Sequence, residues 1–283
     1  MAGTLFVVAT PIGNLEDISA RALRVLREVS LIAAEDTRHT RHLLQRFGLT
    51  TRTTSFHEHS EKGKAAELIA RLTAGDNIAM VSDAGTPGVS DPGEHLIRSA
   101  HAAGIRVEPV PGPSAVVAAL SASGFGSDGF VYLGFPPIKG AARNAWFDRF
   151  AASPTVAEVV VFFEAPHRIE STLAELYRRF GDLEILIGRE LTKAHEEIWL
   201  ARLPVELHEI RGEFTIVINF GQTTSMLERG VEIAALDMVV EFGHMTEKKG
   251  LTRRQAIAAL SRKYRLQARQ IYAMLEASKK SGV

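Results

Sequence analysis

The 283-residue sequence contains no cysteine and carries no net charge, with 33 basic and 33 acidic residues. The absence of cysteine excludes disulfide bonds, thiolate metal ligands and a cysteine nucleophile, and it suits a reducing cytoplasm. No apolar run approaches the roughly 18 residues that a membrane-spanning helix needs, and no basic segment followed by an apolar run opens the chain. We therefore expect a soluble cytoplasmic protein without a membrane partner.

Common nucleotide-binding and hydrolase motifs are also missing. No G-x-G-x-x-G fingerprint follows the first expected strand, and the sequence has neither a G-x-x-x-x-G-K-[ST] phosphate loop nor a G-x-S-x-G nucleophile elbow. NAD or ATP bound in the usual way is therefore not expected.

The charges are unevenly distributed along the chain. Residues 246–283 hold ten Lys and Arg residues but only two Glu residues. Because the whole chain has no net charge, the acidic excess of the remaining residues is as large as the basic excess of this segment. A basic terminus on a neutral protein favours a polyanionic partner. A solvated helix pair with a charged face is the alternative explanation.

Hydrophobic periodicity predicts alternating strands and helices through the first 124 residues. The expected strands are Leu5–Ala9, Leu31–Ala34, Thr51–Phe56, Asn77–Ser82 and Ile105–Val110. The expected helices cover about residues 17–28, 37–47, 61–74, 93–103 and 114–122. This alternation is typical of a mainly parallel sheet covered by helices.

The pattern changes after residue 124. Further strands are expected at Val131–Phe135, Val159–Phe163, Ile185–Gly188, Ile198–Ala201 and Phe214–Phe220. Further helices are expected near residues 140–152, 166–180, 226–242, 252–262 and 267–277. Because only a short polar segment separates two of these strands, they are expected to pair antiparallel in a mixed sheet.

These patterns predict an α/β protein with three domains. Residues 1–124 form an N-terminal parallel α/β domain and residues 125–222 a second, mixed α/β domain. Residues 223–283 form a small, basic, all-α domain that resembles a helix-turn-helix. A helical hairpin used for dimer packing is the alternative role for this last domain.

Three strand ends of the first domain are rich in glycine and proline. Residues 10–14, 82–93 and 109–114 read TPIGN, SDAGTPGVSDPG and PVPGPS. The carboxyl ends of parallel strands share one edge of a sheet, where ligands bind in open α/β folds. Ser114 also begins a predicted helix, whose N-terminus favours a carboxylate or phosphate. An ordinary βα turn would explain any one loop, but the three together predict a ligand crevice.

Seven segments resemble, in order, the ribosomal-RNA branch of the tetrapyrrole methylase family. They are VATPIGNLEDIS (8–19), AAEDTRHT (33–40), SDAGTPGVSDPG (82–93), PVPGPSAVVAALSASG (109–124), FFEAPHRI (162–169), GRELTK (188–193) and GEFTIVI (212–218). The resemblance implies two α/β domains with S-adenosylmethionine in the cleft between them, usually in a homodimer. It also implies methyl transfer to the 2′-oxygen of a cytidine ribose, with 16S ribosomal RNA or the small ribosomal subunit as partner.

The resemblance places a set of residues around the cofactor. These are Pro11, Asp83, Gly85, Thr86, Pro87, Ser114, Ala115, Phe163 and Thr215. Glycines let the backbone approach a ligand closely, and Asp83 supplies a polar anchor for its hydroxyl or ammonium groups.

Methyl transfer to a ribose hydroxyl requires alignment of the reacting atoms and a group that accepts the hydroxyl proton. Glu35, Asp36 and Arg38 follow a strand end and are candidate catalytic residues, and Arg38 is also suited to an RNA phosphate. Glu164, at the end of a buried strand, is a further catalytic candidate. Capped helices are the alternative explanation for both segments. Three further polar residues of the helix expected at 37–47 are expected in solvent: Arg41, His42 and Arg46.

Basic and imidazole side chains supply the candidate RNA contacts. They are Arg38, His57, His59, Lys139, Arg143 and Lys193 in the α/β domains, and Arg253, Arg254, Arg265 and Arg269 in the tail. No metal is expected at His57 and His59, because a third convergent ligand is missing and methyl transfer from a sulfonium needs none. Two positions depart from the family pattern. His195 stands where relatives usually have Phe, and Asn144 where they often have a basic residue.

Two other functions are compatible with the sequence. One is a methylase of the same fold that acts on a small tetrapyrrole, which would leave the basic tail unexplained. The other is a non-catalytic RNA-binding protein that uses the tail and retains the cleft without turnover.

Overall fold

The computed structural model describes residues 1–57, 61–126, 128–221, 241–242, 244–248, 251–264, 271 and 275. Residues 1–219 form one compact unit and residues 220–283 form a second. Within these described ranges, no helix combines the length and apolar character needed to cross a membrane.

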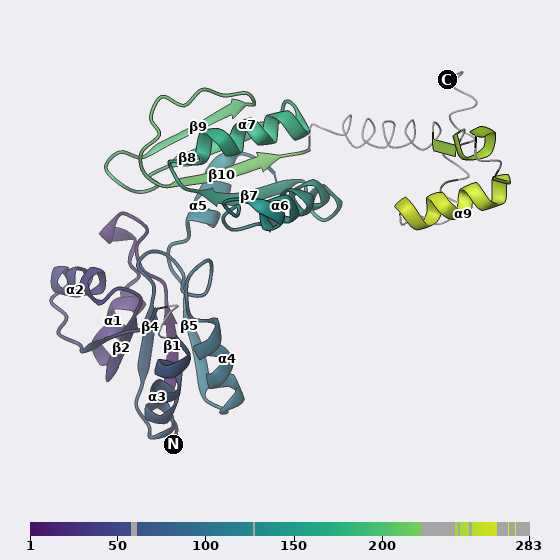
Figure 1. Ribbon diagram of the computed structural model, residues 1–283. Helices are drawn as coiled ribbons and strands as arrows, with labels where there is room; N and C mark the ends of the chain where they lie inside the picture. Colours follow the sequence, from purple (N-terminus) through teal and green to yellow (C-terminus); the bar gives the residue numbers. More distant parts are fainter. Residues whose placement is uncertain are drawn as a thin grey trace. The chain divides into compact units, whose positions relative to one another are not determined.

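The first half of the larger unit is a parallel sheet with helices on both faces (Figure 1). Its strand order is β3-β2-β4-β1-β5, and every pairing is parallel. The strands are β1 (Thr4–Val8), β2 (Leu31–Ala34), β3 (Thr53–Ser55), β4 (Ile78–Val81) and β5 (Arg106–Val110). The helices are α1 (Ala20–Glu28), α2 (Thr37–Arg46), α3 (Glu61–Thr73) and α4 (Glu94–Ala102). The parallel sheet predicted from the sequence is confirmed.

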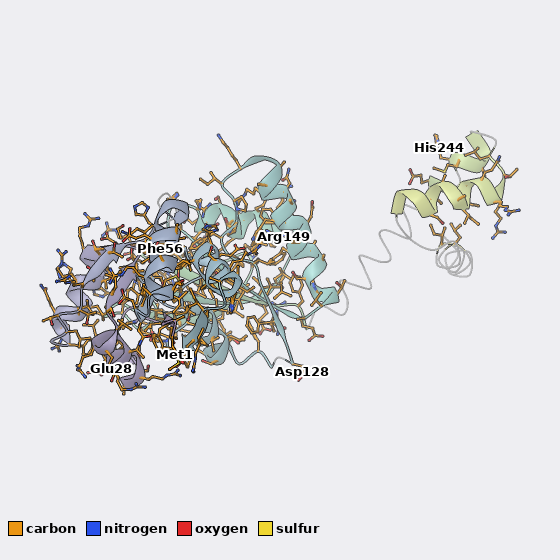
Figure 2. All side chains as sticks on the ribbon, turned by 90° about the horizontal axis from the view of Figure 1, so that it is seen from below. Met1, Glu28, Phe56, Asp128, Arg149 and His244 are labelled. Atoms are coloured by element: carbon orange, nitrogen blue, oxygen red, sulfur yellow. The ribbon has the colours of Figure 1, made fainter. Side chains whose placement is uncertain are left out.

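Both faces of this sheet are buried, which explains why its strands read as continuous apolar runs. In β2, Ile32 and Ala34 pack with residues of α1 and α2, while Leu31 and Ala33 pack with residues of α3 and α4. Phe56, labelled in Figure 2, ends the third strand segment and is 2% exposed. The two apolar layers hold the carboxyl ends of the strands in fixed positions.

Helix α5 (Ala115–Ser123) leads from the first sheet to the second and ends at Gly124, whose φ of 68° is in the left-handed region. The second sheet has the order β6-β7-β10-β8-β9. Its strands are β6 (Phe130–Tyr132), β7 (Val159–Glu164), β8 (Glu184–Arg189), β9 (Glu197–Arg202) and β10 (Phe214–Asn219). Two helices follow β6 and β7, α6 (Gly140–Ala152) and α7 (Ile169–Phe180).

The predicted antiparallel pairing is confirmed, because β8 and β9 run antiparallel with Leu186 opposite Leu200. The pairing of β6 with β7 is parallel, so the sheet is mixed. One face packs on α5. Trp146 of α6 has its ring 5.3 Å from that of Phe162 in β7, and its indole Nε1 donates to the carbonyl of Leu133 at 3.0 Å.

Several element boundaries differ from the sequence prediction, and two of the differences have a clear local reason. Strand β6 ends before Gly134, whose φ is 62°. Helix α7 begins at Ile169 and not at Pro166, because the preceding residues form a turn in which the Arg168 amide donates to the carbonyl of Ala165 at 2.9 Å.

The described part of the second unit contains a π-helical turn (His244–Lys248) and α9 (Arg253–Tyr264). Leu260, Ile271 and Leu275 form its apolar cluster. Most of the helices expected at residues 226–242 and 267–277 lie outside the described residues. The helix-turn-helix interpretation and the domain boundaries at residues 124 and 222 therefore stay predictions.

Candidate functional site

The three glycine- and proline-rich loops meet at the carboxyl edge of the first sheet, as the sequence predicts. The amide of Thr10 donates to the carbonyl of Gly85 at 2.8 Å, and the amide of Gly85 donates back at 3.1 Å. The Thr86 hydroxyl donates to the carbonyl of Pro113 at 3.3 Å. Gly85 and Gly88 both have a φ of 81°, a conformation that strains any residue with a Cβ. Glycine is therefore required for this loop to reach the first strand.

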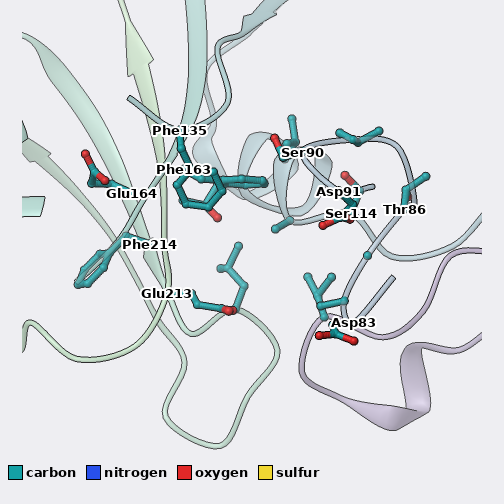
Figure 3. Close-up of a pocket in the computed structure, with 18 of the residues that line it drawn as sticks. Asp83, Thr86, Ser90, Asp91, Ser114, Phe135, Phe163, Glu164, Glu213 and Phe214 are labelled. Carbon is teal, nitrogen blue, oxygen red and sulfur yellow. The ribbon is translucent and has the colours of Figure 1, made fainter. Parts of the chain in front are cut away.

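A cavity of about 410 Å³ lies between these loops and the second sheet. Its lining residues come from both halves of the unit: Ile12, Glu35, Asp83, Ala84, Gly85, Thr86, Val89, Ser90, Asp91, Ser114, Ala115, Val116, Phe135, Phe163, Glu164, Ala165, Pro166, Leu191, Glu213, Phe214 and Thr215. Figure 3 shows Asp83, Asp91 and Ser114 on one side and Phe163 and Phe214 on the other. The cavity thus has an acidic side and an opposite side, called the apolar side below, that is mainly apolar but also includes Glu164 and Glu213.

The acidic side is built from the ends of β2 and β4. The amide of Asp83 donates to Glu35 Oε2 at 3.2 Å, and the amide of Asp36 donates to Asp83 Oδ1 at 3.1 Å. These reciprocal bonds fix two carboxylates beside each other. Because burial removes water and the neighbouring carboxylates carry like charge, Glu35 holds a proton more tightly than it would in solution.

The pKa values of two carboxyls reflect this environment. Burial raises the pKa of Glu35, and the charges of Asp83 and Asp36 add to the effect. Burial, followed by the charge of Glu35, raises the pKa of Asp91 from 3.8 to about 6. A carboxyl with such a pKa can exchange a proton near neutral pH.

The apolar side is held by aromatic contacts. The ring of Phe163 lies 5.3 Å from that of Tyr132 and 5.4 Å from that of Phe135. The Tyr132 hydroxyl also forms a 2.6 Å hydrogen bond with Ser90, a cavity residue with a φ of 64°. This bond connects the loop of residues 82–93 to the second sheet.

A second connection between the two halves lies at the loop after β1. The amide of Asn14 donates to the Thr192 hydroxyl at 3.0 Å. A Cβ at Gly13 would lie 2.4 Å from Cγ of Lys193, so only glycine fits there. The close approach fixes the distance between the loops on either side of the cavity.

Most of the predicted cofactor residues are brought together in the cavity. Seven of the nine line it: Asp83, Gly85, Thr86, Ser114, Ala115, Phe163 and Thr215. Pro11 and Pro87 lie in the same loops but are not among the lining residues. The cofactor contacts of all nine stay predictions.

The predicted catalytic residues occupy different environments. Glu35 lines the cavity, whereas Asp36 and Arg38 do not. Asp36 is the N-cap of α2, where its side chain accepts from the amide of Arg38 at 2.8 Å and pairs with the Arg38 guanidinium at 2.7 Å. The capping explanation therefore accounts for the contacts of Asp36.

Glu164 is 1% exposed, and its carboxylate is fully engaged by the start of α7. Oε1 pairs with Arg168 Nη2 at 2.6 Å and accepts from the amide of Ala165 at 2.9 Å, while Oε2 accepts from the Thr172 hydroxyl at 2.6 Å. These contacts favour a role in holding the helix and the adjacent loop, so a catalytic role for Glu164 stays an untested prediction.

Two of the predicted RNA-binding cations make internal contacts. Arg143 donates to the carbonyl of Pro137 and to the Thr172 hydroxyl, both at 3.0 Å. Lys193 Nζ lies 2.8 Å from Glu190 Oε1 and 2.9 Å from Glu213 Oε2. Lys139, by contrast, is exposed at the N-cap of α6.

The remaining RNA-binding predictions divide by location. Arg38 and His57 are exposed in the larger unit, and Arg253 and Arg254 are exposed at the start of α9. His59, Arg265 and Arg269 lie outside the described residues. Among the described residues, no group of three or more His, Asp or Glu side chains could hold a metal ion.

Sequence reasoning did not assign several residues that line the cavity. Asp91 stands in the same glycine-rich loop as Asp83, and this shared loop could have indicated a place in the cavity. The closeness of Asp91 to Glu35 is visible only in the fold. Phe135 and Leu191 also line the cavity, and their positions follow from the packing of the second sheet.

Comparison with known proteins gives consistent results. Residues 4–205 match the family model described as Tetrapyrrole (Corrin/Porphyrin) Methylases. The chain is 41% identical over 280 residues to Ribosomal RNA small subunit methyltransferase I of Synechocystis sp., covering 95% of this chain and 96% of that protein. It is 52% identical over 210 residues to the protein of the same name from Pseudomonas aeruginosa, covering 74% and 73%.

A solved structure shares the fold. Uroporphyrin-III C-methyltransferase from Thermus thermophilus, in complex with S-adenyl homocysteine, aligns with a TM-score of 0.54 at 19% identity. The alignment covers 76% of this chain and 97% of that chain. The match confirms the predicted fold class of two α/β halves with a cleft between them.

Proposed function

Because this chain belongs to the tetrapyrrole (corrin/porphyrin) methylase family, we propose that it transfers a methyl group from S-adenosylmethionine to a cytidine ribose 2′-oxygen in 16S ribosomal RNA. The observation that carries the RNA substrate is the 41% identity, over 95% of the chain, to a protein named as a small-subunit ribosomal RNA methyltransferase. The proposed partner is accordingly the 16S rRNA or the small ribosomal subunit. A homodimer and a cytoplasmic location are parts of the same proposal.

The cavity suits S-adenosylmethionine in size and charge. Its 410 Å³ fall within the range of small-molecule sites. The sulfonium and ammonium groups of this cofactor are cationic, and the side chains of Glu35, Asp83 and Asp91 supply compensating negative charge. The apolar parts of the cofactor would contact the side of the cavity that contains Phe163 and Leu191.

The bound cofactor would supply an electrophilic methyl group. The protein then has to align the attacking oxygen, exclude water and receive the hydroxyl proton. Phe135 and Phe163 reduce the access of water to the cavity. Asp91, with its pKa of about 6, is largely ionised at neutral pH and is the carboxylate that we assign as the proton acceptor, with Glu35 as its neighbour.

Labelled methyl transfer tests this function directly. The full-length protein is incubated with S-adenosylmethionine labelled at the methyl group and with small ribosomal subunits from cells that lack the modification. The expected product is 2′-O-methylcytidine, identified after nuclease digestion by mass spectrometry. A methyl group on a base, or no transfer to RNA, would contradict the proposal.

Two further measurements separate the alternatives. Methyl transfer to uroporphyrinogen, but not to RNA, would indicate a small-molecule methylase. This alternative is tested because the Thermus thermophilus enzyme shares the fold. Absence of S-adenosylmethionine binding in calorimetry would indicate a non-catalytic RNA-binding protein.

A further inference from the structure

The exposed surface of α2 carries only positive or neutral side chains. The helix, Thr37–Arg46, contains no acidic residue. Its exposed polar residues form one continuous surface: Arg38, His39, Arg41, His42, Gln45 and Arg46. Thr40, Leu43 and Leu44 are buried on the opposite side. We call the exposed set the α2 basic surface.

Other helices pair some of their exposed arginines with Glu residues of the same helix, although Arg27 of α1 and Arg149 of α6 also have no ion pair with a described residue. In α1, Arg24 pairs with Glu28 at 3.3 Å, and in α4, Arg98 pairs with Glu94 at 2.7 Å. On the α2 basic surface, Arg38 pairs with Asp36, but Arg41 and Arg46 have no ion pair with any residue that the structure describes. Cations one helical turn apart repel each other unless a counter-charge is present.

Helix stability does not explain this arrangement. The N-terminal end of a helix carries partial positive charge, so Arg38 in the first turn opposes the dipole, whereas Arg41 lies in the middle of the helix, where the dipole has little effect. Only Arg46, in the last turn, has the favourable position. Arg38 has Asp36 as its partner, but Arg41 and Arg46 have no ion pair with any described residue, and exposed cations without a counter-charge favour an external anion.

The α2 basic surface begins at the cavity. Glu35, which lines the cavity, lies two residues before α2. Arg38 pairs with Asp36 at 2.7 Å, and the amide of Asp36 donates to the cavity residue Asp83 at 3.1 Å, so Arg38 lies near the rim. At 1.5 Å per residue, the surface from Arg38 to Arg46 extends about 12 Å from the rim. Figure 1 shows α2 at the outer margin of the first sheet.

We propose that the α2 basic surface binds the phosphate backbone of the RNA strand whose ribose enters the cavity, with Arg41 and Arg46 on phosphates next to the target nucleotide. This inference rests on the proposed function for the identity of the polyanion. Phosphate contacts fix the register of the strand but read no sequence, so the surface positions the target without selecting its base.

The test compares two double variants of the full-length protein. Arg41→Gln with Arg46→Gln removes the two unpaired charges and retains good helix formers. Arg24→Gln with Arg98→Gln is the matched control, because these exposed arginines are paired with Glu and lie on other helices. Binding to a mixed-sequence single-stranded RNA is measured from 50 to 200 mM salt, together with the KM for unmethylated small subunits.

The α2 variant is expected to lower the slope of log K against log salt by about 1.4, since each lost phosphate contact on a single strand removes about 0.7. Its KM for subunits should rise by about tenfold, because backbone contacts provide much of the affinity. Its kcat and its affinity for S-adenosylmethionine should stay as in the wild type, and the control should change neither slope nor KM.

An unchanged slope and KM in the α2 variant would overturn the inference, as would an equal loss in the control. A weaker affinity for S-adenosylmethionine would also count against it, because the charges would then act on the cavity. Failure of the wild type to methylate small subunits would remove the proposed function. The salt slope tests the surface independently, since RNA binding needs no methyl transfer.

Discussion

Asp91 combines partial burial with neighbouring negative charge. Its pKa is raised by burial and by Glu35 to about 6, whereas Asp36, paired with Arg38, has its pKa lowered. The carboxyls of Asp91 and Asp36, which both follow strands of the first sheet, thus have pKa values shifted in opposite directions. The difference favours Asp91 over Asp36 as the proposed proton acceptor, whereas Asp36 is the N-cap of α2.

Asp91→Asn is expected to lower kcat by about 10²- to 10⁴-fold, because the amide cannot accept the hydroxyl proton. In the wild type, the rate should rise with pH through about 6 and then level, since only the ionised carboxylate is active. Steady-state rates between pH 5 and 8 check both expectations. Glu94→Gln, an exposed carboxylate in α4, is the control. A wild-type profile that is flat over this range would rule out Asp91.

Asp91→Asn should also change the stability of the folded protein, by an amount that depends on pH. The folded state raises the pKa of Asp91 from 3.8 to about 6, so the group stabilises the fold most below about pH 4, and this contribution is lost as the pH rises through about 6. Asp91→Asn should therefore unfold at a higher temperature than the wild type at pH 8, and the difference should shrink at pH 5. Thermal unfolding at the two pH values measures it.

Gly85 has a conformation that only glycine adopts without strain. Gly85→Ala should lower the free energy of unfolding by about 1–2 kcal/mol, because φ at this position is 81°. Gly104→Ala is the control, since Gly104 has a φ of 67° and no atom near its Cβ position. Both variants should lose stability by denaturant unfolding, but only Gly85→Ala should weaken S-adenosylmethionine binding in calorimetry. Equal affinities in the two variants would contradict the role of Gly85 in the cavity.

At the scale of elements, one hydrogen-bonded network joins β7, α6 and α7 to the loop after β6. Arg168 donates to the carbonyl of Pro136 at 2.8 Å, and Arg143 donates to that of Pro137 at 3.0 Å. Glu164 and Thr172 connect the two guanidinium groups. The loop so held carries Phe135, which lines the cavity. The network therefore positions the aromatic side of the site.

Thr172→Val should test this positioning role. Valine keeps the shape but removes the donor to Glu164 and the acceptor of Arg143, which leaves a buried carboxylate less satisfied at a cost of about 1–3 kcal/mol. The affinity for S-adenosylmethionine should fall several-fold, while the pH dependence of kcat stays unchanged. The control, Thr155→Val, alters an exposed threonine that donates only to a local carbonyl. A shifted pH profile in Thr172→Val would indicate that the network acts on proton transfer instead.

At the scale of the whole molecule, charge is unevenly distributed along the chain. The acidic excess belongs to the part of the chain before residue 246, and the basic excess belongs to the tail. A protein built in this way can hold a cationic cofactor in an acidic cavity while the basic tail attracts RNA. The α2 basic surface is the exception within the larger unit, and it lies where the two ligands would meet.

Replacing Arg253 and Arg254 by Gln in the full-length protein should weaken RNA binding and reduce its salt slope, because both cations belong to the basic tail. Affinity for S-adenosylmethionine should be unaffected, since the residues that line the cavity all precede residue 216. Filter binding at several salt concentrations and calorimetry measure the two quantities. An unchanged slope would favour the alternative role of the tail in dimer packing.

The sequence by itself determined most of the elements of the larger unit, the parallel first sheet, the mixed second sheet and the meeting of the three glycine-rich loops. These features depend on periodicity and on local turn chemistry, which neighbouring residues fix. Gly85 and Asp83 could be assigned to the cavity because they stand in a motif at a strand end. The tertiary structure decided the environment of each carboxylate. Glu164 is engaged by Arg168 and Thr172, while Asp91 faces the charge of Glu35. The environment of a carboxylate depends on residues far away in sequence, whose distances are fixed only when the elements pack.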